Sequence, residues 1–214
     1  MALLPFKPRD PDSIIISFLT FRKVIGWLGI LLVPVMIIGS FILDHTNVIQ
    51  VSVSAYYHTS MRNGLVGIVC GMSLFLLCYH GYEWKDSLAS KLAGLFALGI
   101  AFFPTSETSD KGDLASTLHY ITSGIFFAIL AYMSVFLFTK SSGDMTAEKR
   151  KRNKIYRVCG IVMAVAVIGI PIDGIPAIHE RIGRIKPTII LETIALTSFG
   201  FSWLTKGEFL LKDK

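Results

Sequence analysis

The chain has 214 residues, of which 52% are hydrophobic and only 17% are charged, and its formal net charge is +6. Because about 25% of the residues in a typical soluble domain are charged, this composition excludes an ordinary soluble domain and indicates a membrane protein. The positive charge does not require a nucleic-acid partner, since membrane proteins collect Lys and Arg in their cytoplasmic loops.

Six apolar runs follow one another along the chain. Each approaches the ~20 residues that a helix needs to cross the hydrocarbon of a bilayer. We therefore expect an all-α, polytopic integral membrane bundle that forms a single transmembrane domain over residues 1–214. The expected spans are about 24–43, 63–82, 88–104, 117–138, 156–172 and 187–204.

The N-terminal region is polar and interrupted by prolines, and no cleavable signal peptide is expected there. Asp12 or Ser13 is expected to cap the first helix. Pro34 lies inside the first span and is expected to kink it. Glu83 to Asp86 is expected to form a short turn between the second and third spans.

Residues 44–61 form a long connection that is rich in β-branched and aromatic side chains. A re-entrant element, a surface element and a helix leading into the second span are all compatible with this pattern. Gly67 and Gly71, in the second span, have the GxxxG spacing that permits close helix contact in lipid. This face either supports a homo-oligomer or reflects the chain's high glycine content.

The three cysteines, Cys70, Cys78 and Cys159, show neither a disulfide framework nor metal-ligand spacing. We expect them to be buried packing residues. The basic run over 148–157 is expected to fix the topology and to attract anionic lipid.

The distribution of positive charge predicts the orientation of the chain. Most of the 21 Lys and Arg residues fall in the N-terminal region, the 83–91 turn, the 140–157 loop and the C-terminal tail. The few on the alternate side are Arg62, Lys111, Arg181, Arg184 and Lys186. Cytoplasmic loops carry the excess of Lys and Arg, so both termini should be cytoplasmic. The expected location is the cell membrane, in a bacterium the inner membrane.

This topology places several polar residues at the extracytoplasmic end. Glu192 lies inside the sixth span, where a lipid-facing carboxylate is costly, so it should face the bundle interior with a partner. The available partners are Arg62, His58 and His119. The expected cluster is Ser54, Tyr57, His58, Arg62, His119 and Glu192. Glu192 serves either as a structural lock between helices or as part of a functional pocket.

Two histidines and one carboxylate suit a divalent metal such as zinc, with a position left open for water. We expect His58, His119 and Glu192 to be the ligands if a metal is bound. In a catalytic version, Ser54 orients a ligand histidine or the substrate, Arg62 binds an anionic headgroup, and Tyr57 is the third expected catalytic residue. A haem between the two histidines is a less supported alternative.

Two sequence patterns resemble known families. The segment Ser54-Ala-Tyr-Tyr-His58 resembles the SxxxH motif of the superfamily of alkaline ceramidases, progestin and adipoQ receptors and hemolysin III proteins. That resemblance implies a zinc site and, in some members, amide hydrolysis. Those proteins have seven spans and a late HxxxH pair that is absent from this chain. Phe103-Pro104 followed by Leu118-His119-Tyr120 is similar to a pattern in six-span bacterial membrane proteins of the Frag/DRAM type.

The sequence thus predicts a pocket for a lipid or amphiphile at the extracytoplasmic end, belonging to a metal-dependent lipid hydrolase in the catalytic version. Its alternative is non-catalytic: a small-solute transporter or a structural membrane subunit that uses the same polar cluster as a gate or helix lock. The expected partners are membrane lipids, and no nucleic acid.

Overall fold

The computed structural model describes residues 18–81, 83–106, 113–141 and 144–211. The predicted helix cap at Asp12 or Ser13 lies outside these residues. Every regular element in the described part is helical. The elements are α1 (Phe18–Leu43), η2 (Ser54–His58), α2 (Arg62–Cys78), α3 (Trp84–Phe102), α4 (Leu114–Tyr132), η3 (Met133–Leu137), α5 (Ala147–Asp173), α6 (Pro176–Ile182), η4 (Gly183–Ile185) and α7 (Pro187–Lys206).

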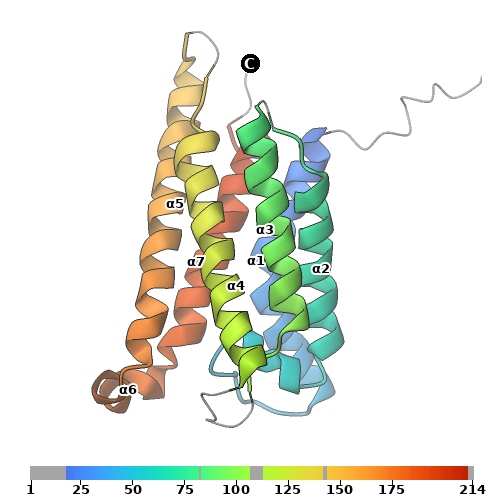
Figure 1. The fold of residues 1–214 in the computed structure, drawn as a ribbon, viewed down its shortest axis with the longest axis vertical. Coiled ribbons are helices and arrows are strands. Elements are labelled where there is room, and N and C mark those ends of the chain that lie inside the picture. Colours follow the sequence, from blue (N-terminus) through green and yellow to red (C-terminus); the bar gives the residue numbers. More distant parts are fainter. Residues whose placement is uncertain (1–17, 82, 107–112, 142–143, 212–214) are drawn as a thin grey trace, which may run out of the picture.

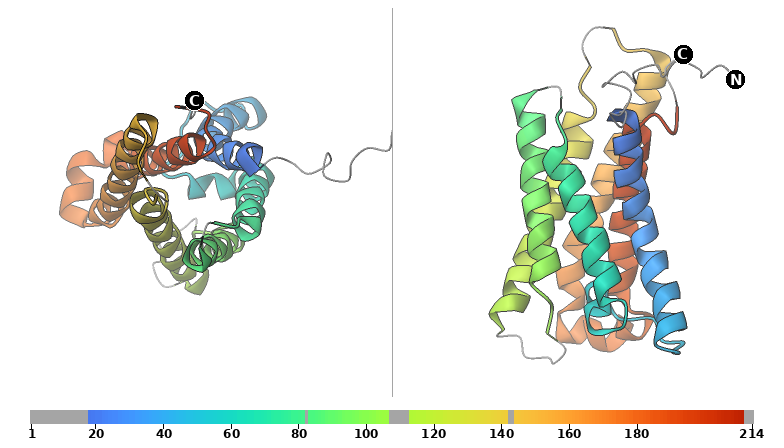
Figure 2. Two further views of the ribbon diagram at one scale, coloured as in Figure 1. Left: turned by 90° about the horizontal axis from the view of Figure 1, so that it is seen from above. Right: turned by 90° about the vertical axis from the view of Figure 1, so that its right-hand side faces the viewer.

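The long helices form a ring around a common core. Each packs against the next along the chain, from α1 through α2, α3, α4 and α5 to α7, and α7 packs back against α1 (Figures 1 and 2). The start of α1 and the end of α7 lie at one end of the ring, which we call the termini end. The segment with η2, the turn before α4, and α6 lie at the other, which we call the η2 end.

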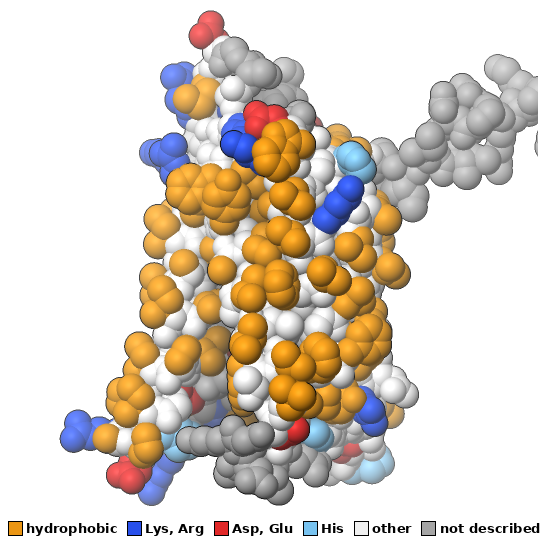
Figure 3. Space-filling model, in the orientation of Figure 1, with side chains coloured by type: hydrophobic (Ala, Val, Ile, Leu, Met, Phe, Trp, Pro, Cys, Tyr) orange, Lys and Arg blue, Asp and Glu red, His pale blue; other side chains and the backbone are white. Residues whose placement is uncertain are grey.

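The outside of the ring suits a membrane. Among the described residues, four helical segments are long and apolar enough to cross a bilayer: α1, α4 with η3, α5 and α7. α2 is a shorter apolar helix. Figure 3 shows hydrophobic side chains over the middle of the visible face and charged side chains toward both ends. Aliphatic side chains such as Leu74, Val165 and Ile168 are more than half exposed, as expected for surfaces that face lipid.

Small residues allow the helices to approach closely, which is typical of packing in lipid. A Cβ atom added to Gly26 would lie 2.8 Å from the Gly200 carbonyl oxygen, so α1 and α7 meet backbone to backbone. A Cβ on Gly94 would lie 2.9 Å from the Ser73 carbonyl oxygen. The Ser73 hydroxyl also donates a 2.7 Å hydrogen bond to the Gly94 carbonyl, which joins α2 to α3.

The helix boundaries differ from the sequence prediction in two informative places. α5 begins at Ala147, well before the expected start at 156, so much of the basic run is helical. The Thr146 hydroxyl caps this helix by accepting from Lys149 N at 3.0 Å. The expected turn at Glu83–Asp86 is instead the capping box that begins α3, since each side chain accepts from the other residue's backbone.

α1 continues as one helix through Pro34, and the kink expected there remains a prediction. The expected burial of the cysteines is tested by the packing. Cys159 is buried, Cys70 is half-buried and Cys78 is exposed. The expectation of burial is therefore wrong for Cys78, which lies on the outer side of α2 at its last residue.

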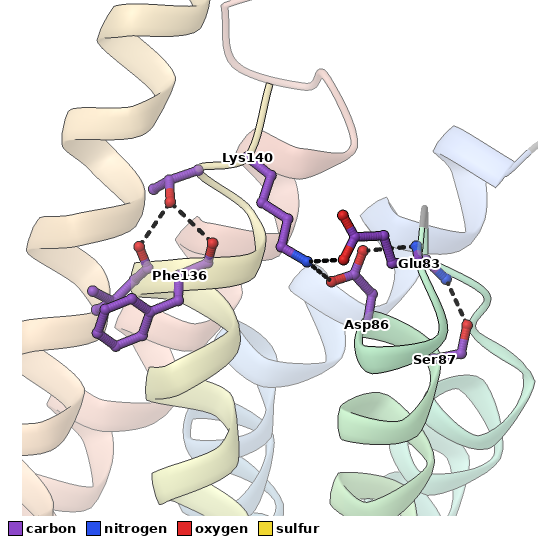
Figure 4. A network of polar contacts seen from close by, with 8 residues as sticks. Glu83, Asp86, Ser87, Phe136 and Lys140 are labelled. Atoms are coloured by element: carbon purple, nitrogen blue, oxygen red, sulfur yellow. Dashed lines mark hydrogen bonds and ion pairs between the residues drawn. The ribbon is translucent and has the colours of Figure 1, made fainter. Parts of the chain in front are cut away.

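Aromatic rings and one lysine close the termini end. Trp203 is buried and makes edge-to-face contacts with Tyr79, Phe138 and Phe199. The Lys140 ammonium, which follows η3, reaches Glu83 at 2.8 Å and Asp86 at 3.1 Å (Figure 4). This ion pair connects the C-terminal end of α4–η3 to the N-terminal end of α3.

Candidate functional site

The connection over residues 44–61 lies across the η2 end of the ring and ends in the short 3-10 helix η2. Tyr56 is completely buried, and its hydroxyl accepts a 3.3 Å hydrogen bond from Gln50 N. Asp44 accepts from the Ser40 hydroxyl at 2.6 Å and from Ser60 N at 3.1 Å. These hydrogen bonds, chiefly that of Ser40, lower the pKa of Asp44 below its usual value. Of the three alternatives for this connection, the helix leading into the second span is excluded, because α2 begins only at Arg62.

Glu192 finds a partner in this connection. Its carboxylate accepts a 2.5 Å hydrogen bond from Val53 N, at the start of η2. The sequence prediction sought a side-chain partner among Arg62, His58 and His119. The structure provides a backbone partner instead, so the carboxylate ties α7 to the start of η2.

Both histidines contact the backbone of residues 103–105, directly after α3. His58 Nε2 lies 2.6 Å from the Thr105 carbonyl oxygen, and His119 Nδ1 lies 2.8 Å from that of Phe103. His119 is buried. These carbonyls flank Pro104, so the imidazoles fix the turn from both sides. The FP…LH pattern in the sequence thus corresponds to a contact between His119 and Phe103.

The predicted metal ligands are each engaged in a backbone contact. Among the residues that the structure describes, no group of three or more His, Cys, Asp and Glu side chains lies together in a way that could hold a metal ion. The contacts of His58 and His119 each use one ring nitrogen, and the contact of Glu192 uses one carboxylate oxygen. The zinc site remains a prediction, which metal analysis of the purified protein would test.

The remaining predicted site residues are Ser54, Tyr57 and Arg62. The Ser54 hydroxyl lies 3.1 Å from that of Ser52. Arg62 donates a 2.6 Å hydrogen bond to the Tyr57 hydroxyl, and its guanidinium carbon lies 4.4 Å from the centre of the Tyr57 ring. Tyr57 and Arg62 are therefore the predicted site residues that pack most directly on each other.

Tyr57 and Arg62 also line an open groove of about 400 Å³ between α2 and α3. We call it the Arg62 groove; its lining residues are Tyr57, Arg62, Asn63, Val66, Gly67, Ala101 and Phe102. The sequence analysis missed the last five as site residues. Asn63 could have been found, since it is a polar residue directly after Arg62 at the start of an otherwise apolar helix.

The two glycines of the GxxxG pattern have different surroundings. A Cβ atom on Gly67 would meet no described heavy atom within 4 Å, whereas one on Gly71 would lie 4.0 Å from a methyl carbon of Leu28 in α1. Gly67 thus opens onto the Arg62 groove and Gly71 faces α1. The homo-oligomer through this face remains a prediction.

A further polar contact at the η2 end was not predicted. The buried Asp173 carboxylate accepts a 2.7 Å hydrogen bond from the Thr188 hydroxyl and lies 3.2 Å from His179 Nδ1. It joins the end of α5 to α6 and to the start of α7.

Comparison with known proteins finds no family model, curated protein or solved structure that matches this chain.

Proposed function

We propose that this chain is an integral membrane protein with six spans and cytoplasmic termini, whose Arg62 groove binds a lipid or amphiphile with an anionic head at the extracytoplasmic surface. The observation that carries the proposal is the make-up of the groove. A cation and polar groups lie at its mouth, and apolar side chains line its wall.

The mouth of the groove suits an anion. A guanidinium has five N–H donors, and the Arg62 contact with Tyr57 uses one of them. Among the described residues, no carboxylate lies within ion-pair distance of Arg62. Arg62 is also the first residue of α2, where the helix dipole adds positive potential and favours an anion. Phosphate and carboxylate heads fit a fork of this kind.

The wall of the groove suits an alkyl chain. Val66 and Gly67 follow Arg62 by about one turn of α2, and Ala101 and Phe102 face them from the end of α3. Phe102 is 63% exposed. Covering this apolar surface with a chain contributes about 0.8 kcal/mol for each buried CH₂ group. The head and the chain of an amphiphile would therefore bind at adjacent places.

Binding of an NBD-labelled fatty acid to the purified protein in neutral detergent tests this proposal. Arg62→Gln removes the cation and should weaken binding about tenfold, the equivalent of 1.4 kcal/mol. Gly67→Leu keeps the Arg62 charge and should block the alkyl chain of the ligand from entering the groove. The affinity for an NBD-labelled alcohol of the same length should change little in Arg62→Gln, because the alcohol has no anionic head. Lys85→Gln, which removes a cation at the termini end, is the control variant and should keep the wild-type affinity for the fatty acid. Wild-type affinity in both groove variants would exclude the site.

The structure favours the helix lock as a second role, carried by other residues. His58, His119 and Glu192 each join two separate segments through a backbone group. His119→Ala should therefore lower the thermal stability in detergent and leave the affinity for the fatty acid unchanged. A loss of affinity at full stability would instead place His119 in the binding site.

A further inference from the structure

Residues 49–53, which we call the strap, lie along the start of α7. The Lys186 ammonium donates to the Ile49 carbonyl, Ile189 N donates to the Val51 carbonyl at 3.1 Å, and Val53 N donates to Glu192 at 2.5 Å. The contacts involve every second residue of the strap and, on the other side, Lys186 at the N-cap of α7 and two residues inside α7. The strap therefore runs beside the first turns of α7.

Ile49, the first residue of the strap, and the two residues before it form one wall of a second groove, of about 500 Å³. We call it the Lys186 groove; its lining residues are Asn47, Val48, Ile49, Ile185, Lys186, Ile189 and Ile190. All but Asn47 and Lys186 are β-branched aliphatic residues. Val48 is 57% exposed and Ile185 is 64% exposed. Because the strap is bonded to α7 at three places, the groove is already formed without a ligand.

A cation stands at the rim of this apolar groove. The Lys186 ammonium has three donors, and its bond to Ile49 uses one of them. Lys186 has a backbone φ of 53°, a left-handed value that is costly for a residue with a side chain. Strained residues of this kind cluster at binding sites and persist only where their surroundings hold them. Here the strap contact supplies that support.

The neighbouring α6 and η4 leave their apolar side chains without full burial. Neither contains a buried residue, and a helix as short as α6 is not stable alone in water. Ile175, Ile182 and Ile185 are exposed on this segment, beside the exposed Arg181 and Arg184. The segment immediately precedes α7, a candidate membrane span, so a membrane crossed by α7 would place the segment near its lipid headgroups. Exposed isoleucines beside basic residues are typical of segments that lie in this interface.

We propose that the Lys186 groove binds one anionic phospholipid, with an acyl chain against the isoleucines and the phosphate on Lys186 and Arg184. The lipid completes the packing of α6 and η4 and joins them to the strap. A second copy of the chain is the competing occupant. It is disfavoured because a two-fold interface over this groove would bring Lys186, Arg181 and Arg184 of both copies into one contact area.

Native mass spectrometry of the full chain, after incubation with phosphatidylglycerol or phosphatidylcholine, tests this proposal. Ile190→Trp should fill the groove and lower the occupancy by one phosphatidylglycerol about tenfold, the equivalent of 1.4 kcal/mol. Ile194→Trp is the matched control, because Ile194 is exposed on the same helix one turn further along and does not line the groove. It should keep the lipid. Arg184→Gln should reduce the preference for phosphatidylglycerol over phosphatidylcholine.

Unchanged lipid occupancy in a folded Ile190→Trp variant would overturn the proposal. So would a lipid-free dimer that Ile190→Trp converts to a monomer, since it would show that a second copy fills the groove. Arg62→Gln should leave this lipid in place. The result is therefore separate from the test of the Arg62 groove, and either proposal can fail alone.

Discussion

At the scale of single residues, the polar groups of the η2 end are satisfied by the backbone. Glu192 accepts from Val53 N, and His58 and His119 lie against carbonyl oxygens on either side of Pro104. The sequence predicted that Glu192, a carboxylate inside an apolar helix, must have a partner. It could not reveal which one, because every residue carries the same backbone groups and their positions depend on the whole fold.

Glu192 offers a direct test of this contact. Glu192→Leu should leave the buried Val53 N–H without an acceptor, at a cost of about 1–3 kcal/mol in the free energy of unfolding. Glu192→Gln keeps an acceptor oxygen and should cost less. Denaturation of the purified protein in detergent measures both. Equal losses in the two variants would show that the hydrogen bond to Val53 is not what Glu192 contributes.

Lys140 gives a prediction that depends on pH. Its hydrogen bonds to Glu83 and Asp86, the larger effect from Glu83, raise the pKa of Lys140 above the ordinary 10.5. The contribution of Lys140 to stability is therefore fully present below about pH 10.5 and is lost as the pH rises through the higher folded-state value.

Lys140→Met should thus destabilise the protein near neutral pH and make less difference in strong alkali. Thermal unfolding of both proteins across this range is the measurement. Glu83→Gln, at the more exposed partner, should cost no more than about 1 kcal/mol. A Lys140→Met deficit that stays constant through strong alkali would contradict the role given to the ammonium charge.

At the scale of elements, hydropathy predicted the long helices, because lipid-facing surfaces leave continuous apolar runs. It did not show that α5 extends back to Ala147 beyond the expected span, since the basic turns of that helix carry no apolar signal. It could not assign residues 44–61, where the strap depends on contacts with α7, more than 130 residues away. The Arg62 groove was predicted only at Tyr57 and Arg62, because its other wall comes from α3.

The close contact between α1 and α7 gives a test at this scale. A side chain at Gly200 would press on Ile30 and would place a Cβ atom 2.6 Å from the Gly26 carbonyl oxygen. Gly200→Ala should therefore cost about 1–3 kcal/mol through overpacking. Gly124→Ala is the matched control, since its Cβ would meet no described atom within 4 Å. It should be neutral or stabilising, because alanine favours a helix more than glycine does. Equal effects at the two glycines would show that α1 and α7 do not meet at Gly200.

At the scale of the whole molecule, the ring has two different ends. Aromatic rings and the Lys140 ion pairs close the termini end, whereas the strap, η2 and two open grooves occupy the η2 end. The charge distribution predicts that the termini end faces the cytoplasm. If it does, both proposed lipid sites open at the same, extracytoplasmic membrane surface.

Labelling from outside intact cells tests this central claim most directly. In a background with Cys70, Cys78 and Cys159 replaced by alanine, Ser60→Cys and Asp144→Cys place one thiol at each end of the ring. Both Ser60 and Asp144 are exposed. A membrane-impermeant thiol reagent should label position 60 in intact cells and position 144 only after permeabilisation. The reverse pattern, or labelling of both positions in intact cells, would contradict the account.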